Sequence, residues 1–127
     1  MPAKPKVLVV EDDLDSYQAL SKILKHVGYE TVSASSLASA LHVIATDLPP
    51  RFIVLDLMLP DGNGKEVLRH VREQNVPAKV AVLTASADKT LLDEIRQLQP
   101  DALFTKPLNV PKLLAWLRQG GTGPSDL

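Results

Sequence analysis

Phe52-Ile53-Val54-Leu55-Asp56-Leu57-Met58-Leu59-Pro60-Asp61-Gly62-Asn63-Gly64 is the stretch that decides the fold. Its unbroken apolar run ends on a single carboxylate, Asp56, and a turn with Pro60, Gly62 and Gly64 follows. Such a run predicts a strand that is buried on both faces, as in a parallel sheet. Open α/β sheets place their functional groups at the carboxyl ends of strands. Asp56 therefore has either a functional role at this edge or the role of a turn cap.

The composition is that of an ordinary globular domain. The 127 residues are 45% hydrophobic and 23% charged, and the net charge of −1 provides no basic field for nucleic acid or anionic lipid. The lack of cysteine excludes disulfides, thiol catalysis and thiolate metal sites. Because no apolar run is long enough for a signal sequence or a membrane span, we expect a soluble, cytoplasmic domain without a membrane partner.

Other apolar runs alternate with helical patterns on both sides of this stretch. Strands are expected over 6–10, 30–34, 52–56, 79–84 and 102–105. Helical spacing of apolar residues follows each of them, over 14–27, 37–44, 65–72, 85–98 and 109–117. This alternation predicts the α/β class, with a doubly wound parallel sheet covered by helices on both faces. We expect residues 1–118 to form this domain and the Gly/Pro/Ser-rich residues 119–127 to be a flexible tail or linker remnant.

Polar side chains follow four of the expected strands: Glu11 and Asp12, Asp56, Thr84, and Lys106. The carboxyl ends of parallel strands share one edge, so these groups can converge. Three neighbouring carboxylates repel one another unless a cation lies between them, and oxygen ligands suit Mg²⁺ or Mn²⁺. Together with a lysine and a hydroxyl, they make a suitable site for a phosphoryl group. The nucleophile would then be a carboxylate, giving an aspartyl phosphate.

The chain resembles the receiver domain of two-component response regulators, up to about Arg118. The residues that carry the resemblance are Val9-Val10-Glu11-Asp12, Leu55-Asp56-Leu57-Met58-Leu59-Pro60 with Gly64, Thr84-Ala85, and Lys106-Pro107. Each motif alone is weak, but here all of them occur in order at strand ends. The resemblance implies a flavodoxin-like (βα)5 fold with the sheet order 2-1-3-4-5.

The resemblance also implies how the acidic residues act. Asp56 would be the phosphoacceptor, and Asp12 would bind the divalent metal directly. Glu11 would bind it largely through water, and the backbone carbonyl of Met58 would complete the metal shell. We assign Asp13, the third acid after the first strand, a structural role at the start of a helix.

The phosphoryl contacts implied by the resemblance are those of Thr84 and Lys106, and the Lys106–Pro107 peptide bond would be cis. Family members usually carry an aromatic residue three positions before the lysine, and it swings inward when the threonine binds the phosphate. Leu103 stands at that position, and Phe104 points to the opposite face, where we expect it in the core. The usual coupling between threonine and aromatic residue is therefore in doubt for this chain.

The leading hypothesis is a phosphoacceptor switch that receives its phosphoryl group from a partner histidine kinase or histidine phosphotransfer protein. It would not be an enzyme beyond its own phosphoryl transfer and slow autodephosphorylation. The alternative is a degenerate, phosphorylation-independent interaction scaffold, which Leu103 favours mildly. An aspartate-nucleophile phosphatase would need a second aspartate where Met58 stands. Flavin or nucleotide binding would need a Gly/Ser/Thr-rich loop instead of the acids after the first strand.

The output of such a switch stays open. Helix four, strand five and helix five could bind an output partner or a second copy, and we expect no direct nucleic-acid binding. The chain could be free-standing or part of a transcription factor or hybrid kinase. His26, His42 and His70 lie on predicted helices and are expected to be exposed helix-face residues rather than phosphodonors.

Overall fold

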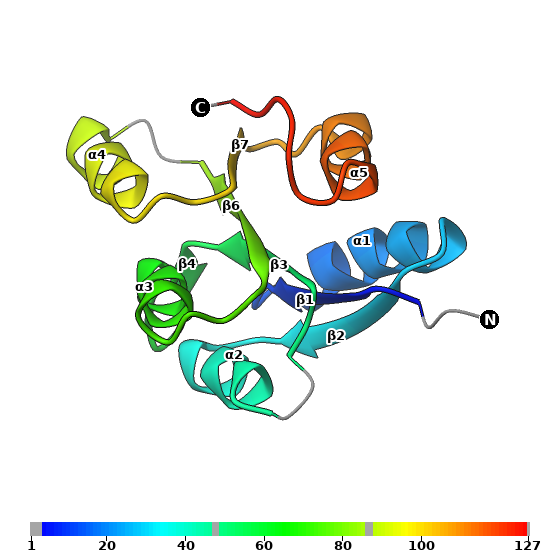
Figure 1. The fold of residues 1–127 in the computed structure, drawn as a ribbon, viewed down its shortest axis with the longest axis horizontal. Coiled ribbons are helices and arrows are strands. Elements are labelled where there is room, and N and C mark those ends of the chain that lie inside the picture. The colour runs from blue at the N-terminus through cyan, green and yellow to red at the C-terminus, as the bar shows by residue number, and fades with distance from the viewer. Residues whose placement is uncertain (1–3, 47–48, 86–87, 127) are drawn as a thin grey trace.

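A five-stranded parallel sheet lies at the centre of the computed structural model, which describes residues 4–46, 49–85 and 88–126 (Figure 1). Its strands are β1 (Lys6–Val10), β2 (Glu30–Ala34), β3 (Phe52–Asp56), β6 (Lys79–Thr84) and β7 (Ala102–Thr105). They are arranged in the order β2-β1-β3-β6-β7. Since β6 and β7 are the fourth and fifth strands of this sheet along the chain, the predicted order 2-1-3-4-5 is confirmed.

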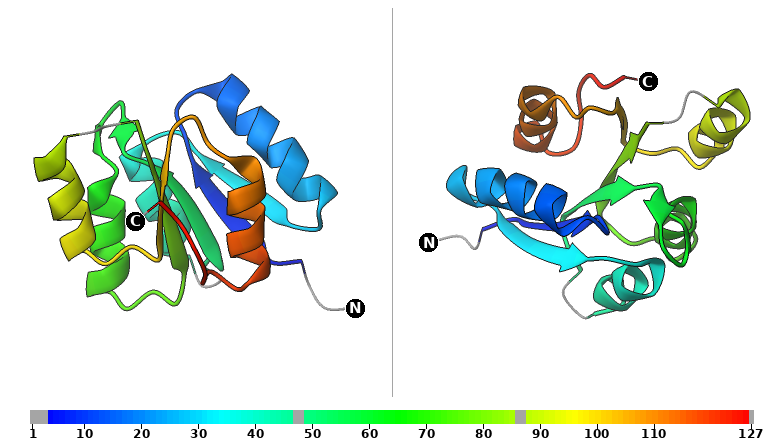
Figure 2. Two further views of the ribbon diagram at one scale, coloured as in Figure 1. Left: turned by 90° about the horizontal axis from the view of Figure 1, so that it is seen from above. Right: turned by 180° about the vertical axis from the view of Figure 1, so that it is seen from behind.

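Five helices cover the two faces of the sheet, as the alternating sequence pattern predicted. They are α1 (Leu14–His26), α2 (Leu37–Ile44), α3 (Lys65–Glu73), α4 (Lys89–Gln97) and α5 (Val110–Arg118). Figures 1 and 2 show α1 and α5 on one face and α2, α3 and α4 on the other. The fold is therefore a doubly wound α/β sandwich, and its crossovers bring the strand ends to one edge.

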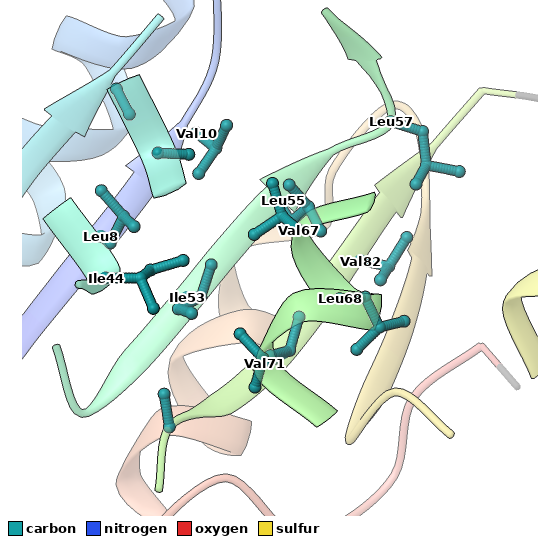
Figure 3. Packing of buried hydrophobic residues seen from close by; sticks show 14 of the residues in the cluster. Leu8, Val10, Ile44, Ile53, Leu55, Leu57, Val67, Leu68, Val71 and Val82 are labelled. Carbon is teal, nitrogen blue, oxygen red and sulfur yellow. The ribbon is translucent and has the colours of Figure 1, made fainter. Parts of the chain in front are cut away.

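The core consists of two apolar clusters, one on each face of the sheet. On the side of α2 and α3, Leu8, Ile53 and Leu55 of the sheet pack against helix residues such as Val67 and Leu68 (Figure 3). On the side of α1 and α5, the buried residues include Leu24, Phe52, Phe104 and Trp116. Both faces of the central strands are thus buried, which is why β1 and β3 are continuous apolar runs.

Phe104 lies in the second cluster, as the alternation of side chains along a strand predicts. Its side chain is 1% exposed, and its ring meets that of Trp116 edge-on with 6.4 Å between centroids. Leu103 points to the opposite face and is buried in the cluster of α2, α3 and α4. Successive residues of β7 are therefore buried in different clusters, because side chains alternate between the two faces of a strand.

The turn after β3 contains more structure than the sequence pattern indicated. Met58–Leu59 (β4) and Gly62–Asn63 (β5) pair as a short antiparallel hairpin. The hairpin folds back tightly, because the Gly64 amide donates to the Leu57 carbonyl at 2.7 Å. A Cβ atom on Gly64 would lie 2.4 Å from the carbonyl oxygen of Asp56, so only glycine fits there.

The helix starts are set by polar side chains. The Asp13 carboxylate accepts from the Ser16 amide at 3.1 Å and caps α1, which confirms the structural role assigned to this acid. Asn109 caps α5 by accepting from the Lys112 amide, also at 3.1 Å. Asp88 caps α4, which begins at Lys89; the predicted start of this helix includes residues 86–87, which lie outside the described residues.

Residues 119–126 follow α5 and return along β7, as the red segment in the left view of Figure 2 shows. The backbone amide of Asp126 donates to the Leu103 carbonyl at 2.7 Å. The flexibility expected of residues 119–127 stays a prediction. A flexible tail would break the bond between Asp126 and Leu103. In the part of the chain that the structure describes, none of the helices has the length and apolar character needed to cross a membrane.

Candidate functional site

The carboxyl edge of the sheet gathers the polar residues that follow its strands. Asp56 ends β3 and Thr84 ends β6, and both side chains are almost completely buried, at 4% and 3% exposed. Lys106 follows β7, and its amide donates to the Thr84 carbonyl at 2.9 Å, which extends the ladder between β6 and β7 by one residue. Glu11 follows β1 and is held by a bond from its amide to the Ala34 carbonyl. The predicted convergence of these four residues is what the register of a parallel sheet produces.

An ion pair between Lys106 and Asp56 occupies the middle of this edge. The Lys106 Nζ donates to Asp56 Oδ2 at 2.5 Å, and the Met58 amide donates to Asp56 Oδ1 at 3.0 Å. Burial pulls the pKa of the Lys106 amine down, but the hydrogen bond and charge of Asp56, with smaller contributions from Glu11 and Asp12, raise it overall. Lys106 is therefore a permanent cation beside the carboxylate of Asp56.

Glu11 is the second carboxyl group of this site. Its pKa is raised to about 7, mainly by burial and then by the hydrogen bond and negative charge of Asp56. The Lys106 Nζ lies 4.0 Å from Glu11 Oε2 and offsets only part of this shift. The negative charge and hydrogen bond of Asp56 thus disfavour the charged form of Glu11, and a bound cation would offset this repulsion.

The oxygen ligands at this edge are of the type that a hard divalent cation prefers. Not all of the candidate carboxylates lie close together, however. Glu11 and Asp56 offer carboxylate oxygens, and the backbone carbonyl of Met58 follows Asp56 by two residues. Asp12 is exposed, and among residues 4–46, 49–85 and 88–126 no group of three His, Cys, Asp or Glu side chains is close enough to hold a metal. The like charges of Glu11 and Asp56 are the observation that favours a cation here.

A cavity of about 280 Å³ opens beside Asp56. Thr84, Ala85 and Lys106 line it together with Met58, whose own side chain is 74% exposed. A small group in this cavity would lie among Asp56, Thr84 and Lys106. The cavity therefore brings Asp56, Thr84 and Lys106 together around one volume, and this arrangement suits phosphoryl chemistry.

A second cavity, of about 300 Å³, lies on the other side of Lys106. It is lined mainly by apolar side chains of α1 and of the segment between Lys106 and α5, including Leu20, Ile23 and Leu108. Asp56 and Thr84 do not line it. Glu11 lines this second cavity and Lys106 lines both, whereas Asp56 and Thr84 face the first one.

The hairpin after β3 is positioned by two side chains, Asp61 and Asn63, that no sequence motif assigned to the site. The Asp61 carboxylate accepts from the amides of Leu37 and Ala38 at 2.6 and 3.0 Å, at the start of α2. Asn63 Oδ1 accepts from the Lys65 amide at 2.8 Å, at the start of α3. These bonds tie the segment that carries Met58 to two helices. An acid after proline in a turn is the only sequence signal for Asp61, and it does not reveal the helix that it caps.

The remaining candidate residues divide into those near the site and those away from it. The peptide bond between Lys106 and Pro107 is cis. Leu103, three residues before Lys106, is buried on the side of α3 and α4. His26, His42 and His70 lie on α1, α2 and α3, where the first two are exposed and the third is half-buried. None of these histidines lines the cavity beside Asp56.

Comparison with known proteins agrees with this geometry. A family model described as the response regulator receiver domain matches residues 7–118. The transcriptional regulatory protein KdpE of Mycobacterium tuberculosis is 38% identical over 114 residues, which make up 88% of this chain and 49% of KdpE. Sporulation initiation phosphotransferase F of Bacillus subtilis is 24% identical over 108 residues, covering 85% of this chain and 86% of that protein.

Among solved structures, the receiver domain of the Francisella response regulator 1452 is similar, with a TM-score of 0.84 and 29% sequence identity. The match covers 93% of this chain and 97% of the Francisella chain. The first curated relatives are longer, and this chain spans about half of their length.

Proposed function

Because the chain belongs to the receiver domain family of response regulators, we propose that it is a phosphoacceptor switch in a two-component phosphorelay. Asp56 accepts a phosphoryl group, and the modified domain changes its affinity for a partner. The observation that carries this proposal is the buried Asp56 carboxylate, paired with Lys106 and facing a cavity of about 280 Å³ that Thr84 also lines.

In the proposed transfer, a carboxylate oxygen of Asp56 attacks the phosphorus of a phosphohistidine on a histidine kinase or histidine phosphotransfer protein. The new bond is between phosphorus and oxygen, the bond between phosphorus and the imidazole nitrogen breaks, and its electron pair leaves with the imidazole. Lys106 then exchanges its contact with the free carboxylate for one with a phosphoryl oxygen. The Thr84 hydroxyl donates a hydrogen bond to another oxygen of the same group.

Glu11, Asp12, Asp56 and the Met58 carbonyl are the residues that would hold Mg²⁺ or Mn²⁺. The metal would supply positive charge to the phosphoryl oxygens during transfer. The raised pKa of Glu11, caused by burial and by neighbouring Asp56, supports a cation at this position, because a cation would relieve their repulsion.

We further propose a cytoplasmic protein whose only catalysis is its own phosphoryl transfer and slow hydrolysis of the aspartyl phosphate. Residues 1–118 would act as the receiver and residues 119–127 as a tail or linker. The phosphorylated domain would bind an output partner or a second copy through the surface of α4, β7 and α5, and it would not bind nucleic acid directly.

Incubation with acetyl phosphate and Mg²⁺, followed by intact-mass analysis, tests the phosphoacceptor role. We expect one acid-stable, base-labile phosphoryl adduct on the wild-type chain and none on Asp56→Asn. Asp15→Asn, which removes an exposed acid from the first turn of α1, should be modified like the wild type. No adduct on the wild type would favour the scaffold alternative, and an adduct on Asp56→Asn would place the phosphoacceptor elsewhere.

A further inference from the structure

The outer edge of β7 is occupied by the chain's own last described residues. Among the described strands, β7 pairs with β6 alone, and the bond from the Lys106 amide to the Thr84 carbonyl shows which residues of β7 face β6. Leu103 and Thr105 alternate along the strand with the residues that face β6, so their backbone amides and carbonyls point away from β6. The Asp126 amide donates to the Leu103 carbonyl at 2.7 Å, and the Leu103 amide donates to Ser125 Oγ at 3.3 Å.

The side chain of Asp126 binds the same edge at a second point. Its Oδ2 accepts from the Thr105 amide at 2.9 Å and from the Thr105 hydroxyl at 3.1 Å. Its Oδ1 accepts from Lys112 Nζ, on α5, at 3.1 Å. These bonds hold the pKa of Asp126 below its usual value, the one from the Thr105 amide having the largest effect. All outward amides of this four-residue strand are therefore engaged.

The chain reverses after α5 to reach this position. Gly120, Gly121 and Gly123 adopt positive φ angles of 75°, 85° and 102°. The Gly121 amide donates to the Trp116 carbonyl at 3.0 Å, which closes the end of α5, and Gly121 itself is buried against the Lys79 side chain. Glycine is suited to these left-handed angles, so the sequence of this segment favours the reversal.

We propose that residues 121–126 form an intrachain clasp that occupies the outer edge of β7 and competes with a second copy of this chain for that edge. An open strand edge presents unpaired amides and carbonyls, and these are a template for another strand. A second copy offers the same edge, and two identical edges can pair antiparallel about a two-fold axis. The two arrangements exclude each other because both use the outward groups of Leu103 and Thr105. This inference does not depend on phosphorylation of Asp56.

Amide hydrogen exchange, measured by NMR on the full chain, tests whether the clasp is closed. In the wild type we expect the Thr105 and Leu103 amides to be protected. In Asp126→Ala, the Thr105 amide should exchange at least tenfold faster, because its acceptor is gone. The Phe104 amide, which faces β6, should be unchanged and serves as an internal reference. Wild-type Thr105 and Leu103 amides that exchange at unprotected rates would overturn the clasp and support a flexible tail.

Sedimentation velocity over a range of concentrations tests the competition with a second copy. Asp126→Pro removes both the amide proton and the carboxylate, and we expect it to dimerise with increasing concentration while the wild type stays monomeric. Glu73→Ala, which removes an exposed acid at the end of α3, is the matched control and should behave like the wild type. A monomeric Asp126→Pro variant with a native circular dichroism spectrum would overturn the competition. A wild-type dimer would overturn it as well. If the proline variant does not fold, Asp126→Ala frees the Thr105 part of the edge, and a variant that stays monomeric at every concentration would overturn the competition.

Discussion

At the scale of single residues, the site depends on Lys106. Its amine lies between the carboxyl groups of Asp56 and Glu11, at 2.5 and 4.0 Å. Without it, Asp56 would be a buried carboxylate beside a second acid. The convergence of Lys106 with the two carboxyl groups could be predicted from the strand ends, whereas the distances between these groups could not, because they depend on the side-chain conformations in the folded chain.

We expect Lys106→Ala to lower the free energy of unfolding at neutral pH. Removing one partner of a fully buried pair costs about 3–5 kcal/mol. Because the Lys106 side chain is 36% exposed and solvent screens the pair, we expect a loss of about 1–2 kcal/mol. Urea unfolding measures the loss, and Lys22→Ala on the exposed side of α1 is the control. Equal losses in the two variants would show that the pair contributes nothing specific.

At the scale of elements, the hairpin of β4 and β5 positions the loop that follows Asp56. The sequence predicted a turn here from Pro60, Gly62 and Gly64. It did not predict the two short strands, because two-residue strands carry no periodic signal. Asp61 and Gly64 connect this hairpin to α2 and to β3, and each leads to a prediction.

Gly64→Ala should disturb Asp56 directly. The new Cβ would meet the Asp56 carbonyl oxygen at 2.4 Å and the Leu57 Cα at 3.0 Å, and neither backbone atom can move without shifting the end of β3. We expect a loss of about 1–3 kcal/mol in the free energy of unfolding, as for overpacked sites. Modification by acetyl phosphate should also slow.

The control for this variant is Gly28→Ala. Gly28 has a φ of 104°, and among the described residues beyond its chain neighbours no atom lies within 4 Å of an added Cβ, so its substitution causes backbone strain without a collision. We expect it to lower stability by about 1–2 kcal/mol and to leave modification of Asp56 unchanged. If both variants slow modification equally, the close approach of Gly64 to β3 has no bearing on the site.

Asp61 should make the stability of α2 depend on pH. Bonds from the Ala38 and Leu37 amides hold the pKa of its carboxyl below the usual 3.8. A group whose pKa is lower in the folded state stabilises the fold above its unfolded pKa, and the effect disappears as the pH falls through the folded value. Asp61→Ala should therefore melt a few degrees below the wild type at neutral pH.

Thermal melts across the acidic range measure this effect. The difference between Asp61→Ala and the wild type should begin to shrink near pH 3.8 and vanish below the lowered pKa. Glu73→Ala should show no such trend. A difference that stays constant down to the lowest pH would mean that the charge of Asp61 plays no part in capping α2.

At the scale of the whole molecule, a metal held at the carboxyl edge would stabilise the entire fold. A ligand that binds only the folded state adds about 2.7 kcal/mol at a hundredfold excess over its dissociation constant. We therefore expect Mg²⁺ to raise the melting temperature of the wild type, and chelation to reverse the shift. Asp12→Ala should lose most of the shift, although Asp12 is exposed in this structure.

Asp15→Ala is the control for this measurement, since Asp15 is exposed in the first turn of α1. It should respond to Mg²⁺ as the wild type does. An equal shift in Asp12→Ala and Asp15→Ala would exclude Asp12 from the metal shell.

The fold and the polar residues of the site follow largely from local sequence patterns. The apolar run from Phe52 to Leu55 is long enough to specify a buried strand, and the alternation of such runs with helical patterns specifies a doubly wound sheet. The convergence of Asp56, Thr84 and Lys106 follows from that topology, because parallel strands end at one edge.

Tertiary structure decided which distant groups each polar residue contacts. Asp61 and Asp126 are both acids in turn-forming segments, yet one caps α2 and the other binds β7 and Lys112. Similarly, the burial of Glu11 beside Asp56 sets its raised pKa, and Leu103 and Phe104 enter opposite cores. Hydrophobic periodicity acts over a few residues and can be recognised in a chain. Hydrogen bonds and pKa shifts depend on atoms a few ångströms apart, and only the folded chain brings those atoms together.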